Sequence, residues 1–307
     1  LHPIITEKAI KTQQEVVKEE KRLRENQPYG NLFQVVSENL FKVHPYNNFI
    51  IGSMDDLSSA SVDYYLEFNK KFHVPNNAAL VVAGDIDIKK TKEMINKYFS
   101  DIPRGIDIPR DYPMEEEITS AIKVESFDKN IQIPAYLLAY RTPGHNEREA
   151  YVMEMISIYL SGGQSSKLYK KIVDEKKLAL QISSQNLSLE DYSVYFIFSL
   201  PMGETNMETI LNEIDSEIEL MQTDLISDKD FQKIQNIIEN RFVSSNSTVA
   251  GIGNSLAHNY FFHDSTNHIN TELSIYKSIS KEEIREVAQR LLGKNQRLEL
   301  KYLPENE

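Results

Sequence analysis

The chain has 307 residues, of which 40% are hydrophobic and 26% are charged, and its formal net charge is −12 at pH 7. This composition is typical of a globular protein long enough for two domains, and it excludes a disordered or fibrous chain. The acidic balance excludes a general nucleic-acid-binding surface, because phosphate contacts need a basic face, and the absence of Cys excludes disulfides and thiolate metal sites.

Strongly periodic helices alternate with short β-rich runs, which predicts an α+β protein. The expected helices are 7–25, 61–72, 88–99, 148–160, 164–175, 208–221, 228–242 and 280–292. The expected strands are 78–83, 133–140, 192–200 and 297–303. The proline-rich stretch 100–119, with an acidic run at 115–117, indicates a linker. The longest apolar runs are of strand length, so we expect no membrane span.

The two halves of the chain resemble each other near their ends. In each half a helix with a polar N-cap leads into an asparagine loop and then an expected strand. At an offset of 219 residues, the matching pairs are Ser61 and Ser280, Tyr65 and Ile284, Phe68 and Val287, Phe72 and Leu291, and Asn76 and Asn295. The common offset predicts a duplicated unit, that is, two similar α/β sandwiches. The second copy would begin near residue 122, so the first copy would lack its beginning.

The first expected helix carries a carboxylate on an apolar face. Ala9, Val16 and Leu23 recur at helical spacing, and Gln13 and Glu20 complete the same face. A buried carboxylate needs a partner, because an unpaired buried charge is costly. A metal ion is one such partner. An exposed Glu paired with Lys or Arg is the other interpretation, and the spacing alone favours it.

Several motifs resemble those of one known family. They are QEVVKEEKR at 14–22, ENQPYG at 25–30, HPY at 44–46, PNNA through VVAGD at 75–85, SGGQSSKLY at 161–169 and EKKLA at 175–179. In this order they resemble the pitrilysin/insulinase family of zinc metallopeptidases. The first four are similar to the later part of its catalytic domain. The last two are similar to its paired, non-catalytic domain.

The resemblance implies a zinc site of which this chain holds one ligand. Family members bind Zn2+ through an inverted H-x-x-E-H motif on one helix and a glutamate from a later helix, and the motif Glu is the general base. The glutamate that follows the paired valines is Glu20, and the matching position in the second copy is Arg241, which cannot bind a metal. Some members have a second glutamate where this chain has Gln13, which can hydrogen-bond beside the site but cannot act as a base.

The H-x-x-E-H motif itself is absent, and no two of the seven histidines are four residues apart. We therefore expect Zn2+ in the full-length protein, with the motif in the missing start of the first copy. This fragment would contain no catalytic residue, bind no zinc and hydrolyse nothing.

The SGGQSS motif precedes the expected helix 164–175. Glycines there are explained by turn chemistry. By analogy with glycine-rich loops in the partner subunits of related processing peptidases, the residues of this loop would face a peptide chamber. These residues are Gly162, Gly163, Ser165 and Ser166.

These inferences predict the later part of a catalytic-type domain at 1–105, a linker at 106–121 and a non-catalytic domain at 122–307. The expected function is zinc-dependent peptide hydrolysis by the full-length protein, acting on peptides or small unfolded proteins with a second half or protomer of the same family. The alternative is a non-catalytic scaffold or substrate-holding subunit of such a peptidase. The compartment stays open, with an extracytoplasmic (periplasmic) location favoured over the cytoplasm.

Overall fold

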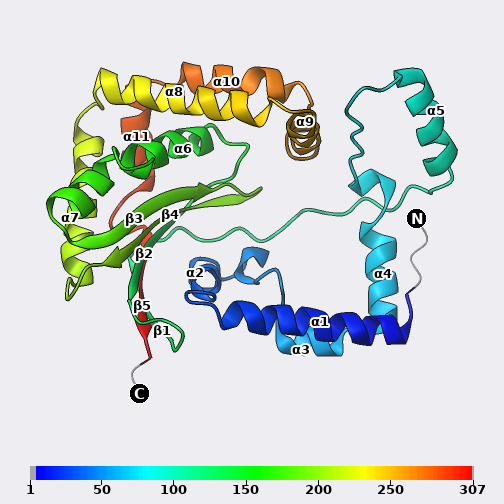
Figure 1. The fold of residues 1–307 in the computed structure, drawn as a ribbon, viewed down its shortest axis with the longest axis horizontal. Helices are drawn as coiled ribbons and strands as arrows, with labels where there is room; N and C mark the ends of the chain where they lie inside the picture. The colour runs from blue at the N-terminus through cyan, green and yellow to red at the C-terminus, as the bar shows by residue number, and fades with distance from the viewer. Residues whose placement is uncertain (1–4, 306–307) are drawn as a thin grey trace. The chain divides into compact units, whose positions relative to one another are not determined.

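The computed structural model describes residues 5–305, which form two compact units (Figure 1). The first unit contains the residues up to 24, then 49–112 and 241–271. The second contains 25–48, 113–240 and the residues from 272 onward. The compact units differ from the expected domains in two segments: residues 25–48 belong to the second unit, and residues 241–271 belong to the first. The predicted domains 1–105 and 122–307 were defined as copies of a repeated unit and not as compact units. These ranges stay a prediction.

The second unit is built around one mixed five-stranded sheet with the strand order β1-β5-β2-β4-β3. The strands are β1 (Ile122–Asp128), β2 (Ala135–Pro143), β3 (Ala179–Leu187), β4 (Tyr192–Pro201) and β5 (Arg297–Pro304). Only the β1–β5 pair among them is parallel. The expected strands 133–140, 192–200 and 297–303 are confirmed as β2, β4 and β5.

Both faces of this sheet are buried (Figure 1). On β2, Leu137 and Ala139 face a cluster that includes α2 (Leu32–Leu40). Leu138 and Tyr140, at the alternate positions, face a larger cluster on the other side. That cluster is formed with α6 (Arg148–Ser161), α7 (Met207–Thr223) and α11 (Lys281–Leu291), and with the neighbouring parts of α8 (Asp228–Ser245) and α10 (His268–Ser278).

The expected helix 164–175 is wrong in its first part. Residues 163–166 form a turn, and η3 (Tyr169–Glu175), which follows, is wound as a π-helix. At its end the backbone N–H of Lys176 donates to the carbonyl of Lys171, five residues earlier. This winding keeps Ile172 and Val173 in the core.

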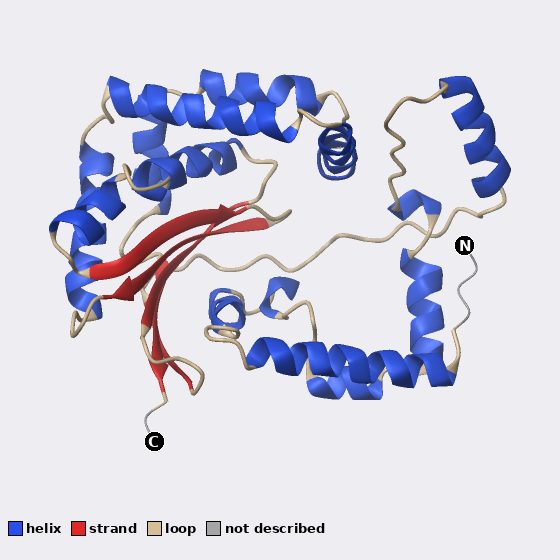
Figure 2. Cartoon of the chain, in the orientation of Figure 1, coloured by secondary structure: helices blue, strands red, loops and turns tan. Residues whose placement is uncertain are grey.

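The first unit consists of helices. They are α1 (Glu7–Glu25), α3 (Met54–Ser59), α4 (Val62–Phe72), α5 (Ile88–Phe99) and α9 (Val249–His263), with the short turn η2 (Pro75–Asn77); η1 (Pro45–Asn47) belongs to the second unit. The expected strand 78–83 is wrong: this segment is a loop (Figure 2). A strand needs a neighbour to accept its backbone hydrogen bonds, and every strand within residues 5–305 lies in the second unit.

The first unit has almost no core of its own in the described part of the chain. Helices α3, α4 and α5 bury no side chain, and both hydrophobic clusters consist of second-unit residues. Large apolar side chains are exposed instead, among them Val16, Leu23, Tyr64, Leu66, Phe68, Leu80, Val82, Ile88, Met94 and Tyr98. An exposed apolar surface of this kind is typical of an interaction face.

The α+β class is thus confirmed, whereas a duplicated sandwich is not what the described residues show. The structure agrees with the predicted similarity of the two halves at one pair of helices. Ser61 and Ser280 cap two helices of 11 residues, α4 and α11. No helix within residues 5–305 combines the length and the apolar character needed to span a bilayer.

Candidate functional site

Helix α1 exposes the face that carries Glu20. Its inward side chains are those of Ile10, Gln14 and Lys21, and Gln14 donates to the carbonyl of Ala60 at 3.0 Å. The expected apolar stripe lies on the other side, where Val16 is 54% and Leu23 is 60% exposed. Glu20 and Gln13 are exposed on that side as well. Glu20 is therefore a surface residue in this chain on its own, which is the exposed interpretation that the spacing alone favours.

The residues present do not make a zinc site by themselves. Zinc in proteins takes at least three protein ligands, and within residues 5–305 no group of three or more His, Cys, Asp or Glu side chains could hold a metal ion. Neighbouring Glu19 is exposed and pairs with Arg22 at 3.2 Å, as expected for a surface residue. The binding of zinc by Glu20, with Gln13 beside it, stays a prediction.

The glycine-rich loop connects α6 with η3 in the second unit. Gly162 ends α6 and donates to the carbonyl of Ile158 at 2.8 Å, and Gly163 has a φ of +104°. Lys233 Nζ donates to the hydroxyl of Ser165 at 2.6 Å. The hydroxyl of Ser166 is buried without a hydrogen-bond partner in the described structure. The loop thus combines turn chemistry with one unsatisfied hydroxyl, and its role in a peptide chamber stays a prediction.

Replacing Gly163 by Ala should lower the free energy of unfolding by about 1 to 2 kcal/mol, because a side chain rarely adopts this backbone conformation. A Cβ at this position would meet no atom within 4 Å, so the cost comes from the backbone alone. Urea unfolding followed by circular dichroism measures it. Exposed Gln164→Ala is the matched control, and equal stabilities of the two variants would contradict the assignment.

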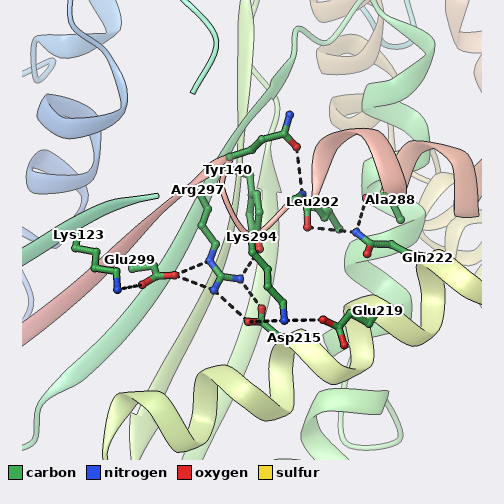
Figure 3. A network of polar contacts seen from close by, with 12 residues as sticks. Lys123, Tyr140, Asp215, Glu219, Gln222, Ala288, Leu292, Lys294, Arg297 and Glu299 are labelled. Atoms are coloured by element: carbon green, nitrogen blue, oxygen red, sulfur yellow. Dashed lines mark hydrogen bonds and ion pairs between the residues drawn. The ribbon is translucent and has the colours of Figure 1, made fainter. Parts of the chain in front are cut away.

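Figure 3 shows a network of charged groups around Arg297 that no sequence motif indicates. Arg297 of β5 is 2% exposed and makes two hydrogen bonds to Asp215 of α7, one of them at 3.2 Å. Its Nε donates to Glu299 at 2.9 Å, and its Nη1 to the Tyr140 hydroxyl at 3.3 Å. Lys294 adds a partly exposed contact to Asp215 at 3.7 Å.

Strand geometry explains why these groups meet. Leu298 and Leu300 face the α2 side of the sheet, so Arg297 and Glu299 point to the α7 side. Burial raises the pKa of Tyr140 to about 12, although Arg297 favours its ionised form. Burial opposes the charge of Arg297, but its hydrogen bonds and electrostatic attraction to Asp215 and Tyr140 together outweigh burial and raise the pKa of the guanidinium. The network is structural, since each charged group in it has a partner of opposite charge.

Comparison with known proteins identifies relatives of this chain. The sequence profile of the family described as "Peptidase M16 inactive domain" matches residues 59–238. "Zinc protease PqqE" of Helicobacter pylori is 28% identical over 247 residues, which cover 78% of this chain and 55% of that protein.

Two solved structures share the fold. The crystal structure of a protease from Helicobacter pylori has a TM-score of 0.89 at 23% identity and covers 97% of this chain and 73% of that one. The first half of the periplasmic protease PqqL from Escherichia coli has a TM-score of 0.75 at 16% identity, covering 98% and 67%.

The chain spans little more than half the length of the curated relative described above. The profile match covers more than half of this chain, and it includes both the PNNA motif and the SGGQSS motif. The resemblance inferred from those motifs is confirmed: the chain belongs to the peptidase M16 family, whose inactive-domain profile it matches.

Proposed function

We propose that this chain is part of a zinc-dependent peptidase and supplies Glu20 as one of its zinc ligands. The observation that carries the proposal is the exposed face of α1, where Glu20 lies between Val16 and Leu23. Apolar side chains on both sides of a carboxylate are favourable only if another surface covers them and the carboxylate gains a partner. A helix that carries the H-x-x-E-H motif meets both needs.

The rest of the first unit supports a covering polypeptide. Leu80 and Val82 are exposed in a segment with the apolar, β-branched composition of a strand. Helices α4 and α5 also carry exposed apolar side chains. The covering polypeptide would supply both the missing zinc ligands and strands that pair with residues 78–83.

In the complete protein, bound zinc would polarise the scissile carbonyl and activate water. The second unit would close a chamber for peptides or small unfolded proteins, with Gly162, Gly163, Ser165 and Ser166 facing it. A periplasmic location is proposed as well. It is supported by the periplasmic origin of PqqL, whose first half shares this fold.

The test is complementation. The chain is expected to bind no zinc and to leave a quenched fluorescent peptide intact. Co-expression with a polypeptide of the same family that carries H-x-x-E-H, either in the same chain or as a separate protomer, is expected to give a stable complex with one zinc ion and peptidase activity. Hydrolysis by the chain alone, at a rate that chelation of zinc abolishes, would contradict the proposal.

Replacing Leu23 by Glu tests the covering surface separately from the metal. Because Leu23 is exposed, the variant chain should keep its stability within about 0.5 kcal/mol. Its association with the complementing polypeptide should weaken at least about tenfold, because a charge would be buried without a partner. Titration calorimetry measures the association, and exposed Lys11→Glu, at the start of the same helix, is the control. Undiminished association would exclude this face.

A non-catalytic subunit is the second candidate, because the matching family profile describes an inactive domain. A scaffold of this kind would associate with a family partner without binding zinc through Glu20. Zinc analysis of the purified complex separates the two candidates, since only the peptidase would lose its zinc when Glu20 is replaced.

A further inference from the structure

The turn that follows α2 forms an anion-binding nest on the second unit. The backbone N–H groups of residues 42–44 all donate to one oxygen atom, Glu115 Oε1, at distances of 2.6, 2.8 and 2.8 Å. Successive N–H groups that point to one place attract an anion, because their dipoles add. The guanidinium of Arg141 lies 3.3 Å from the second carboxylate oxygen, Oε2. Three N–H dipoles and one full positive charge therefore surround one carboxylate.

The carboxylate that fills the nest comes from a segment without regular structure. Residues 100–121 contain no helix or strand, yet the Glu115 side chain is only 4% exposed. Burial by itself would raise the pKa of Glu115, but the three N–H donors and Arg141 outweigh it and hold the pKa below its ordinary value. The nest therefore favours a charged carboxylate over a neutral carboxyl group. Charge-assisted hydrogen bonds of this kind are about twice as strong as neutral ones.

The nest is held in shape by contacts that do not involve the bound carboxylate. His44 Nδ1 accepts from the Tyr46 N–H at 3.2 Å, so Nε2 carries the proton and donates to Asp191 at 3.1 Å. Arg141 is fixed as well, because its Nη1 donates to the carbonyl of Leu40 at 2.9 Å. A site whose donors are already in place binds an anion with little cost of reordering.

Two cavities of the second unit adjoin the bound carboxylate. One has a volume of about 450 Å³ and is lined in part by Tyr192. The other has a volume of about 590 Å³ and is lined in part by Val43 and Ile118. Glu115 and Arg141 line both. Volumes of this size are in the range of ligand pockets, so a molecule that placed a carboxylate in the nest would have space for its other atoms.

We propose that the nest at residues 42–44, together with Arg141, is a binding site for a carboxylate of a peptide, and that Glu115 occupies it as an internal ligand. The bound group belongs to an irregular stretch of polypeptide, so a flexible peptide with a carboxylate offers the same chemistry. An internal ligand acts at an effective concentration of about millimolar. A peptide therefore binds when Glu115 leaves, and the two compete for the same donors. The site does not depend on the proposed zinc chemistry.

Emptying the site in the whole chain tests the proposal. Glu115→Ala removes the internal carboxylate but leaves the backbone donors and Arg141. Sodium acetate is the probe, and hydrogen exchange read by mass spectrometry is the measurement. Saturating acetate should increase the protection of the amides at 42–44 in this variant at least about tenfold, because it replaces the lost acceptor.

Three controls show whether the effect belongs to the site. Sodium chloride at the same concentration controls for ionic strength, and acetamide has the shape of acetate without its charge. Neither should protect the amides at 42–44 in Glu115→Ala. In the unsubstituted chain the site is filled, so acetate should change nothing. Exposed Glu117→Ala, in the same acidic run, should behave like the unsubstituted chain.

Unprotected amides at 42–44 in Glu115→Ala with acetate would overturn the proposal, and so would equal protection by chloride or acetamide. If Glu115→Ala does not fold, acetate should restore its circular dichroism spectrum, because a ligand that binds only the native state stabilises that state. Failure to restore the spectrum would overturn the proposal as well.

Two isomeric probes then distinguish the source of the carboxylate in the Glu115→Ala variant. N-acetylglutamine carries only a terminal carboxylate, and N-acetylisoglutamine carries only a side-chain carboxylate. Stronger protection by the first assigns the site to the end of a peptide, and stronger protection by the second assigns it to an acidic side chain within one. Protection by acetate but by neither isomer would overturn a peptide ligand.

Discussion

In the zinc-bound form proposed for the complete protein, replacing Glu20 by Gln is expected to lower zinc affinity and peptide hydrolysis by at least about 100-fold. Substitution of groups that merely support zinc ligands already costs 10- to 100-fold, and a neutral amide is a much poorer zinc ligand than a carboxylate. Zinc content by mass spectrometry and turnover of a quenched peptide measure the two losses independently. A metal readout is needed because activity alone can fall for many reasons.

Two controls are present on the same helix. Glu19→Gln removes an adjacent carboxylate that pairs with Arg22 on the surface, and it should leave zinc binding unchanged. Gln13→Ala should lower zinc affinity by about 10- to 100-fold, less than Glu20→Gln, because Gln13 can only support the site. If Glu20→Gln retained one tightly bound zinc ion, or if Glu19→Gln lost it, the assignment of the ligand would be wrong.

Replacing Arg297 by Met is expected to destabilise the second unit by about 3 to 5 kcal/mol. The substitution keeps an apolar stem of similar length but leaves the buried Asp215 and the largely buried Glu299 on either side of a missing cation. Breaking a buried ion pair by removing one partner has this magnitude, because the remaining charge is uncompensated. Urea unfolding followed by circular dichroism measures the change.

Lys294→Met is the matched control. It removes a second cation near Asp215, but one that is 57% exposed, so the loss should stay below about 1 kcal/mol. A triple variant in which Asp215, Arg297 and Glu299 all become apolar should recover most of the stability, because no charge is then left buried. Equal effects of Arg297→Met and Lys294→Met would show that the network contributes no more than a surface ion pair.

The elements that could be predicted from sequence are those whose signal is local. Helix α1 was predicted with both ends correct, and α5 likewise, because amphipathic periodicity and capping residues such as Asp87 lie within each helix. Strand 78–83 was wrong although its composition is right, because a strand also requires a neighbour. The π-helix η3 was missed because nothing in its periodicity distinguishes wide from ordinary winding.

In the candidate site, too, the residues with a local sequence signal could be predicted, and the contacts between distant residues could not. Glu20 was identified through a motif that is contiguous in sequence, but the sequence left its burial open because burial depends on what packs against α1. Asp215 and Arg297 are separated by more than 70 residues, and so are Glu115 and the backbone N–H groups of residues 42–44 that donate hydrogen bonds to its carboxylate. Sequence spacing carries no signal for such pairs.

The sequence by itself determined the family, the α+β class, most helices and the position of the proposed zinc ligand, since each depends on residues close together in the chain. Only the tertiary structure decided three further features: that the first unit exposes its apolar faces, that Arg297 is held between two carboxylates, and that Glu115 ties the linker to the sheet. The physical reason is that burial and charge pairing are properties of surfaces in contact, and folding brings those surfaces together from distant parts of the chain.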